Sequence, residues 1–186
     1  VWCPSLYSKE GNIVNNSLAR VTNEIKACWT GLNSETTTRV RDLLVELTKT
    51  TEKEEWLDQI VKQKPAAQVL YSDQRHGFIL LAHSEKYGTY RVPHDHGAGW
   101  VFYAVQSGEM EMNTYKKVTT AKGRTHLVAR GKENMKPGDC RVFLPGDIHD
   151  TLCVSENFIQ FRLTSSDFKE EIKSGRMTRY LYEKTP

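Results

Sequence analysis

Apolar residues in the first third of the chain recur at spacings of three and four, the period of a helix that lies with one side on an apolar surface. The pattern predicts three such helices. Their apolar positions are Leu18, Val21, Ile25 and Trp29 in the first, Val40, Leu43, Leu44 and Leu47 in the second, and Trp56, Leu57, Ile60 and Val61 in the third. The first helix has a capping candidate at Ser17 and a stop signal at Gly31. The second begins near Ser34. The third covers residues 51–63, because Pro65 cannot continue a helix.

From Gln68 onward the pattern changes to short runs of β-forming residues with turn signals at regular intervals. The predicted strands cover residues 68–71, 77–83, 89–94, 100–106, 109–117, 126–129, 140–144 and 158–164. Pairs such as Arg130-Gly131 and Pro137-Gly138 are interpreted as turns between them. After Ser165, a polar tail is expected to add one helical turn and a last strand or extended arm.

This order predicts a single domain, because compact domains commonly have about 100 to 200 residues and this chain has 186. Residues 1–66 form a helical cover in this interpretation, and residues 67–186 form an all-β sandwich or barrel with a C-terminal arm. Apart from two blocks that contain glycine and histidine, the chain has no internal repeat.

Composition restricts the partners. The chain has 26 basic and 23 acidic residues, a formal charge of +3, and no Lys/Arg stripe that would follow a phosphate backbone, so nucleic acid is not expected as a partner. No apolar run approaches the roughly 20 residues of a membrane-spanning helix. The four cysteines show neither a CxxC motif nor a dense disulfide framework, which favours reduced thiols and a cytoplasmic protein. Because the sequence begins at Val1 rather than methionine, the question of a removed leader stays open.

Three histidines carry the strongest chemical signal. His94 and His96 are one residue apart beside a proline, and residues i and i+2 of an extended strand project from the same face. The segment 143–150, FLPGDIHD, places His149 at another strand end. Three neutral imidazoles that leave coordination positions open are typical of a catalytic centre for a divalent transition metal.

The two blocks resemble the cupins. In the first, Gly88 lies six residues before His94, His96 follows, and Gly108 closes the block. The second block, residues 138–149, ends in the Pro-Gly-x-x-His pattern of cupin strands. The resemblance implies a cupin double-stranded β-helix, or jelly-roll barrel, preceded by a layer of about three α-helices. It also implies that strand edges pair two copies into a homodimer.

The chain is similar to a three-histidine subgroup of cupins, the cysteine dioxygenase-like thiol dioxygenases. Val101 stands where most cupins have a glutamate ligand, so the metal would keep more of its charge to attract an anionic substrate. The resemblance implies Fe(II) held by His94, His96 and His149, with dioxygen as co-substrate; Zn, Ni or Mn are the other metals considered. Where this family has an inward Ser-x-His-x-Tyr triad, the chain has Gln160, Arg162 and Thr164.

Four residues are candidates for substrate contacts. If strand alternation holds, Arg162 points into the barrel, where it would clamp a carboxylate or phosphonate and take part in catalysis. In the alternative, Arg162 faces outward and Ile159, Phe161 and Leu163 form the inner core. Tyr103 is expected to line the cavity as a hydrogen-bond donor or mild acid, or to pack with its hydroxyl at the rim. Gln160 is expected to orient substrate or to make a structural bond, and Arg75 to bind substrate.

The remaining histidines and the acids beside the ligands have simpler predicted roles. His76, His83 and His126 are interpreted as surface or core residues. Asp95 is expected to face away from the site and serve a turn or a supporting contact. The acids that flank His149, Asp147 and Asp150, are expected to fix its tautomer.

These observations support three hypotheses for the function. The first is a mononuclear Fe(II) dioxygenase that acts on a small anionic substrate such as a thiol acid. The second is a non-redox isomerase, lyase or decarboxylase that uses Zn, Ni or Mn as a Lewis acid, and activity without oxygen would distinguish it. The third is a ligand-binding cupin module.

Overall fold

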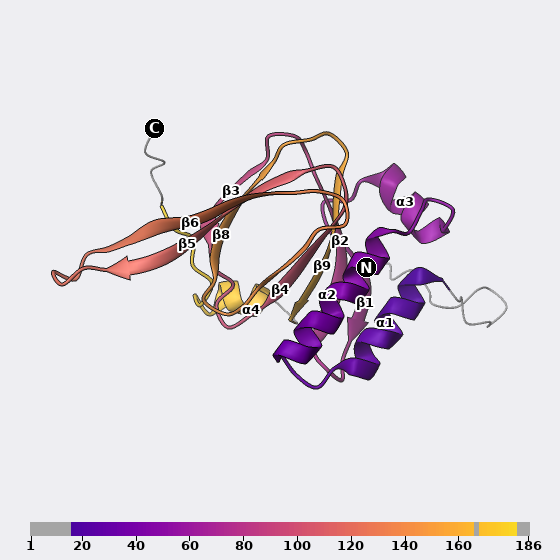
Figure 1. Cartoon of the computed structure of the whole chain (residues 1–186), viewed down its shortest axis with the longest axis horizontal. Coiled ribbons are helices and arrows are strands. Elements are labelled where there is room, and N and C mark those ends of the chain that lie inside the picture. The colour runs from indigo at the N-terminus through magenta and orange to yellow at the C-terminus, as the bar shows by residue number, and fades with distance from the viewer. Residues whose placement is uncertain (1–15, 166–167, 182–186) are drawn as a thin grey trace.

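Two antiparallel sheets that face each other form the body of the protein (Figure 1). The computed structural model describes residues 16–165 and 168–181. Its strands are β1 Gln68–Asp73, β2 Phe78–Glu85, β3 Tyr90–His94, β4 Val101–Ser107, β5 Met110–Thr119, β6 Thr125–Met135, β7 Cys140–Phe143, β8 Ile148–Cys153 and β9 Phe158–Ser165. One sheet has the order β1-β2-β9-β4-β7, and the other has the order β3-β8-β5-β6.

The strand order identifies the fold. From β2 onward, the first sheet contains β2, β9, β4 and β7 and the second contains β3, β8, β5 and β6, so the chain passes repeatedly between the sheets. This is the eight-stranded jelly roll, the double-stranded β-helix of cupins, with β1 added at one edge. The predicted fold class, mainly β with helices in front of the barrel, is confirmed.

Three helices precede the barrel and cover the outer face of the five-stranded sheet (Figure 1). They are α1 Ser17–Cys28, α2 Ser34–Thr48 and α3 Glu55–Gln63. The predicted cap at Ser17 is wrong by one position, because the side chain of Asn16 accepts the hydrogen bond from the Ala19 N–H. The backbone N–H and hydroxyl of Ser17 instead donate to Glu54, at the start of α3.

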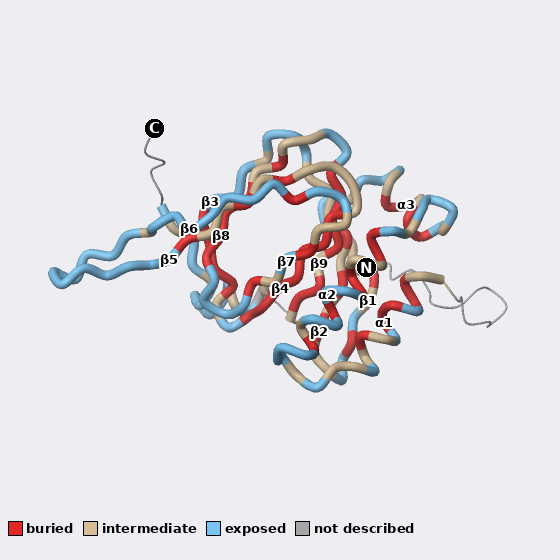
Figure 2. Tube along the Cα trace, in the orientation of Figure 1, coloured by how far each residue is buried: buried red, intermediate tan, exposed pale blue. Residues whose placement is uncertain are grey.

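Alternating side chains of the five-stranded sheet contribute to two separate cores. Phe102, Phe161 and Leu163 pack outward with the apolar stripes of the three helices. Val101 and Tyr103 point inward and pack with side chains from the second sheet. Figure 2 shows buried positions along the strands of both sheets and along the helices. The inner face is therefore free to carry a site while the outer face anchors the sheet.

Two parts of the strand prediction are wrong. The predicted strand ranges leave out Ile148–Cys153, although His149 was placed at a strand end, and these residues form β8. The expected turn at Arg130-Gly131 is instead part of β6, where the pairing shifts register by one residue. Because β5 and β6 stay paired as far as Thr119 and Thr125, they form a long exposed ribbon that projects from the barrel (Figures 1 and 2).

The C-terminal segment returns to the barrel. As predicted, it forms one short helix, α4 Phe168–Lys173, and then an extended arm. The arm pairs with β3, because the Tyr180 N–H donates to the Pro93 carbonyl at 2.8 Å and the Asp95 N–H donates to the Thr178 carbonyl at 3.1 Å. This pairing places the arm directly beside the histidine loop.

Two further expectations concern the environment of the protein. Within residues 16–165 and 168–181, no helix has the length and apolar character needed to cross a membrane. Cys28, Cys140 and Cys153 are free thiols, as expected, and Cys3 lies outside the described residues.

Candidate metal centre

The structure brings together the three histidines that the sequence singles out. His94 is the last residue of β3 and pairs directly with His149 at the start of β8. His96 follows in the loop after β3. All three are buried, and one ring nitrogen from each lies within 4.8 Å of the others. Among the described residues, this is the group of His, Cys, Asp and Glu side chains arranged to hold a metal ion.

His96 lies two residues beyond the end of a strand. The strand ends at His94, and the side chains of His94 and His96 enter the same cluster, as expected. The carboxylate of Asp95 accepts hydrogen bonds from the Gly97 N–H at 3.0 Å, the Thr178 N–H at 3.0 Å and the Tyr180 hydroxyl at 2.7 Å. Asp95 therefore faces away from the site and fixes the loop, as predicted.

The three imidazoles are neutral. Burial lowers the pKa of His96 to about 3 and holds the pKa values of His94 and His149 below the ordinary range. The Nδ1 of His94 lies 2.8 Å from the Val92 carbonyl, which places its proton there and leaves Nε2 with a lone pair. Both ring nitrogens of His149 are buried without a hydrogen-bond partner.

This donor set fits a divalent transition metal. Metal binding requires unprotonated imidazole nitrogens, and buried nitrogens without a partner gain one when they bind a cation. Val101 is buried inside the barrel at the position where a carboxylate ligand would be expected, and its side chain cannot bind metal. Three neutral ligands would leave the full charge of the ion facing the cavity.

The expected role of the acids beside His149 is wrong. Asp150 is fully buried, and its carboxylate accepts hydrogen bonds from the Asn113 side chain at 2.7 Å and the Tyr115 hydroxyl at 2.7 Å. Because adjacent residues of a strand project to opposite faces, Asp150 points away from the cluster. Asp147 caps a turn by accepting from the Leu144 N–H. Neither acid bonds the ring of His149.

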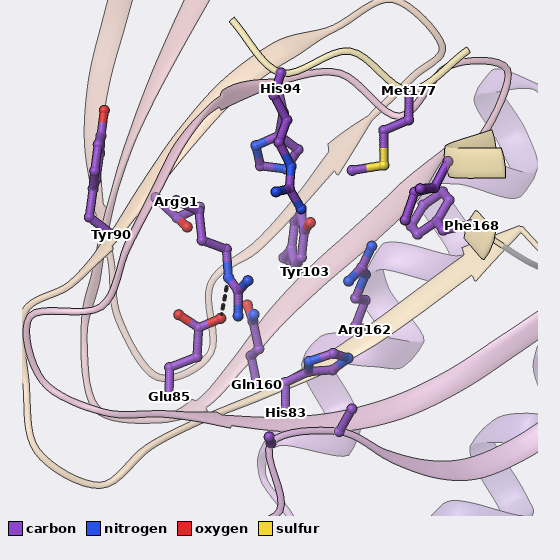
Figure 3. A pocket seen from close by; sticks show the side chains of 15 residues that line it. His83, Glu85, Tyr90, Arg91, His94, Tyr103, Gln160, Arg162, Phe168 and Met177 are labelled. Carbon is purple, nitrogen blue, oxygen red and sulfur yellow. Dashed lines mark hydrogen bonds and ion pairs between the residues drawn. The ribbon is translucent and has the colours of Figure 1, made fainter. Parts of the chain in front are cut away.

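A cavity of about 440 Å³ opens beside the histidines (Figure 3). His94 lines it from one sheet, and the opposite wall belongs to β2, β4 and β9. The polar residues of that wall are His83, Glu85, Tyr103, Gln160 and Arg162. Phe168 of α4 and Met177 from the arm close one side.

Arg162 points into this cavity. Its guanidinium lies 5.5 Å from the ring centre of Tyr103 and 4.6 Å from that of Phe168, and its Nε is buried without a hydrogen-bond partner. No carboxylate forms an ion pair with it within residues 16–165 and 168–181. The alternative, in which Phe161 and Leu163 form the inner core, is wrong because these side chains pack against the helices.

Tyr103 and Gln160 line the same wall. Tyr103 is buried, and its hydroxyl lies 3.4 Å from Nε2 of His96. Burial raises the pKa of this phenol, so it stays a hydrogen-bond donor at neutral pH. Gln160 is also buried, and its Oε1 has no partner. The roles predicted for these two residues stay predictions.

The structure places Arg75 elsewhere. It lies in the turn between β1 and β2 and is not among the residues that line the cavity, so its position does not support the predicted role in substrate binding. The residues of β2 that reach the cavity are His83 and Glu85, which the sequence interpretation missed. Strand alternation could have found them, because both share the parity of Leu81, which pairs with Arg162.

Fold and site together define a double-stranded β-helix protein with a buried three-histidine cluster. No family model matches the chain, and no curated protein matches it. Among solved structures, KdgF from Halomonas sp. is 16% identical with a TM-score of 0.42, over 54% of this chain and 77% of that one. A cupin superfamily protein from Desulfitobacterium hafniense DCB-2 is 16% identical with a TM-score of 0.41, over 54% and 76%.

A third similar structure is oxalate decarboxylase from Bacillus subtilis, 16% identical with a TM-score of 0.37, where the match covers 55% of this chain and 24% of that chain. Likenesses of this strength carry no information about activity. The fold assignment rests on the strand order, and the chemistry has to be argued from the residues.

Proposed function

We propose that this protein is a mononuclear metal-dependent dioxygenase that acts on a small anionic substrate such as a thiol acid. The observation that carries the proposal is a cluster of three neutral imidazoles that meets a cavity through His94, with the guanidinium of Arg162 in the same cavity and without an anionic partner among the described residues. A partly buried cation without a counter-charge is unfavourable, and an anionic substrate would supply that charge.

The residues divide into two groups by task. His94, His96 and His149 would hold the metal, and their similarity to the ligands of the thiol dioxygenases supports Fe(II). When bound, a ferrous ion supplies redox chemistry toward dioxygen and a positive centre for an anionic donor group. Arg162 would orient the substrate anion through its planar fork of N–H donors. Tyr103 would donate a hydrogen bond beside the metal.

The cavity wall contributes by excluding water. The ring of Phe168 stacks on that of His96 at 5.0 Å between centres and also covers the guanidinium of Arg162. Interactions between charges strengthen when water is displaced from around them. The segment that contains α4 and the arm therefore supports binding of the anion as well as enclosing it.

Metal analysis of protein purified without oxygen, followed by oxygen-consumption assays on small thiol acids and diketones, tests this proposal. We expect about one iron per chain and oxygen uptake with at least one thiol acid. His96→Ala should abolish both with the fold intact, because two imidazoles bind the ion more weakly. His126→Ala, at an exposed position on the ribbon, should keep both.

Three results would contradict the proposal. Turnover without oxygen, on Zn, Ni or Mn, would indicate a non-redox isomerase, lyase or decarboxylase. Binding of small acids without turnover under any condition would indicate a ligand-binding module. Stoichiometric metal in the His96→Ala variant would refute the ligand assignment.

A further inference from the structure

His83 is a fourth histidine of the site, and its position does not suit metal binding. It lies on the wall opposite His94, pairs across strands with Gln160, and is the diagonal neighbour of Arg162, which pairs with Leu81. Diagonal neighbours on one face of a sheet lie roughly 7 Å apart at their Cβ atoms. A molecule of a few carbon atoms can therefore reach the side chains of His83 and Arg162 at once (Figure 3).

The ring of His83 presents a hydrogen-bond acceptor to the cavity. Its Nε2 is buried without a partner, and the ring hydrogen-bonds to the backbone of Ala66, which favours a proton on the other nitrogen. Burial and the nearby charge of Arg162 lower the pKa of His83 to about 3. The imidazole is therefore neutral at physiological pH, and its Nε2 can accept but not donate.

The charges around the cavity select a neutral donor for this acceptor. Among the lining residues that the structure describes, Arg91, Arg162 and Arg179 stand against the one carboxylate of Glu85. One oxygen of Glu85 already pairs with Arg91 at 2.8 Å. A cationic group placed at His83 would lie beside Arg162 and be repelled by it. A hydroxyl or amide N–H meets no such repulsion and satisfies the buried nitrogen.

We propose that His83 determines specificity by accepting a hydrogen bond from a neutral hydroxyl or amide N–H of the substrate, while Arg162 holds the substrate's anionic group. The substrate class is then a small acid that carries a neutral donor near its anionic end. This inference rests on the proposed function, because it requires the anion on Arg162. It adds a residue and a chemical requirement that the metal centre alone does not imply.

Calorimetric titration of the Zn-loaded protein tests the inference without turnover. The probes are propionate, lactate and 3-hydroxypropionate, which differ by the presence and place of one hydroxyl. We expect one hydroxy acid to bind about tenfold more tightly than propionate, because the plain acid leaves the nitrogen of His83 buried and unsatisfied. His83→Phe should reduce that ratio to about one, whereas His83→Gln, which keeps an acceptor, should restore part of it.

The controls separate this inference from the proposed function. Arg162→Met should abolish binding of all three acids, and zinc content with urea unfolding shows whether each variant keeps its metal and fold. Equal binding of the three acids to the wild type, or an unchanged ratio in folded His83→Phe, overturns the role of His83 alone. If no acid binds the wild type, or Arg162→Met binds them as well as the wild type, the anion clamp fails and the inference fails with it.

Discussion

At the residue scale, buried polar atoms without a partner are concentrated around the cavity. Among the described residues, they belong to His83, Ser84, Glu85, His96, His149, Thr151, Gln160 and Arg162. All of these residues except Ser84 either line the cavity or belong to the histidine cluster. An unsatisfied buried group is unfavourable by about 1 to 3 kcal/mol, so its position needs an explanation. A bound ion and a polar ligand would satisfy these atoms together.

The sequence predicts only some of these residues. His94, His96 and His149 can be identified from the sequence because their spacing and neighbours form two motifs. Arg162 follows from strand parity once the β9 segment is recognised. His83 and Glu85 are isolated residues in an ordinary strand, and only the register of β2 against β9 reveals that they face Arg162. Paired strands bring together side chains that no local pattern connects.

Metal-free protein should lose stability in mild acid, partly through His83. In the unfolded chain a histidine takes up a proton as the pH falls through about 6.5, whereas folded His83 has a pKa of about 3. Its contribution is therefore complete above pH ~6.5 and is lost as the pH falls toward 3. Between pH 7 and pH 5, the loss from this residue amounts to about 2 kcal/mol.

Urea unfolding of wild type and His83→Phe at pH 7 and pH 5 measures this contribution. The variant should lose about 2 kcal/mol less than the wild type between the two pH values. His126→Phe, at an exposed position, should behave as the wild type does. Equal losses in the wild type and in His83→Phe would show that His83 does not titrate differently in the folded protein.

At the scale of elements, the helices are predicted well and β8 is not. The stripes of α1, α2 and α3 follow a period of 3.6 because one side of each helix packs on the sheet. In β8, His149, Asp150 and Thr151 are polar and buried in succession. One face of β8 carries the metal cluster and the other carries the bonds of Asp150, so no apolar alternation marks it as a strand.

The loop that carries His96 depends on a glycine. Gly97 has a φ of 62°, and a Cβ there would clash with the Glu171 carboxylate and lie 3.0 Å from the Cβ of Arg176. Gly88 has a φ of 79° with nothing near the same position. Gly97→Ala and Gly88→Ala thus carry a similar backbone strain of about 1 kcal/mol, and only the first also displaces a neighbouring element.

We expect Gly97→Ala to weaken metal binding and to increase amide hydrogen exchange in α4 and the arm, because these segments must move to admit the methyl group. Gly88→Ala should leave both properties near the wild-type values. Metal titration and hydrogen exchange on the two variants make the comparison. Equal exchange in the two variants would mean that α4 and the arm are not held against this loop.

At the scale of the whole molecule, positive charge gathers on one projecting element. Residues 113–135 contain six Lys and Arg residues and one acid, a net charge of +5, whereas the whole chain carries +3. The rest of the chain therefore has a net negative charge, which the nearly balanced total charge of the chain does not reveal. The free edge of this ribbon is β6, and its basic residues Arg130 and Lys132 hinder pairing of this edge with other chains.

The ribbon beyond the barrel should be dispensable for folding. Lys116 pairs with Val128, so replacing residues 117–127 by Asn-Gly closes a shorter hairpin. The removed residues are exposed or half-buried, and we expect the free energy of unfolding to change by less than about 1 kcal/mol and metal content to persist.

The stability of the shortened protein is compared with that of Tyr115→Phe, a substitution at the base of the ribbon. It removes the 2.7 Å hydrogen bond to the buried carboxylate of Asp150 and should destabilise the protein by about 1 to 3 kcal/mol. Urea unfolding measures both proteins. A trimmed protein that unfolds more readily than Tyr115→Phe would show that the ribbon supports the barrel.

The hydrogen bonds that the Asp95 carboxylate accepts from Thr178 and Tyr180 also set an order of events during biosynthesis. The loop between two ligand histidines is synthesised more than eighty residues before the arm that fixes it, as separations of 83 and 85 residues show. A nascent chain that has just completed the barrel still lacks this support. The ion should therefore enter after translation, and a ribosome stalled before residue 178 should carry a barrel that cannot retain it.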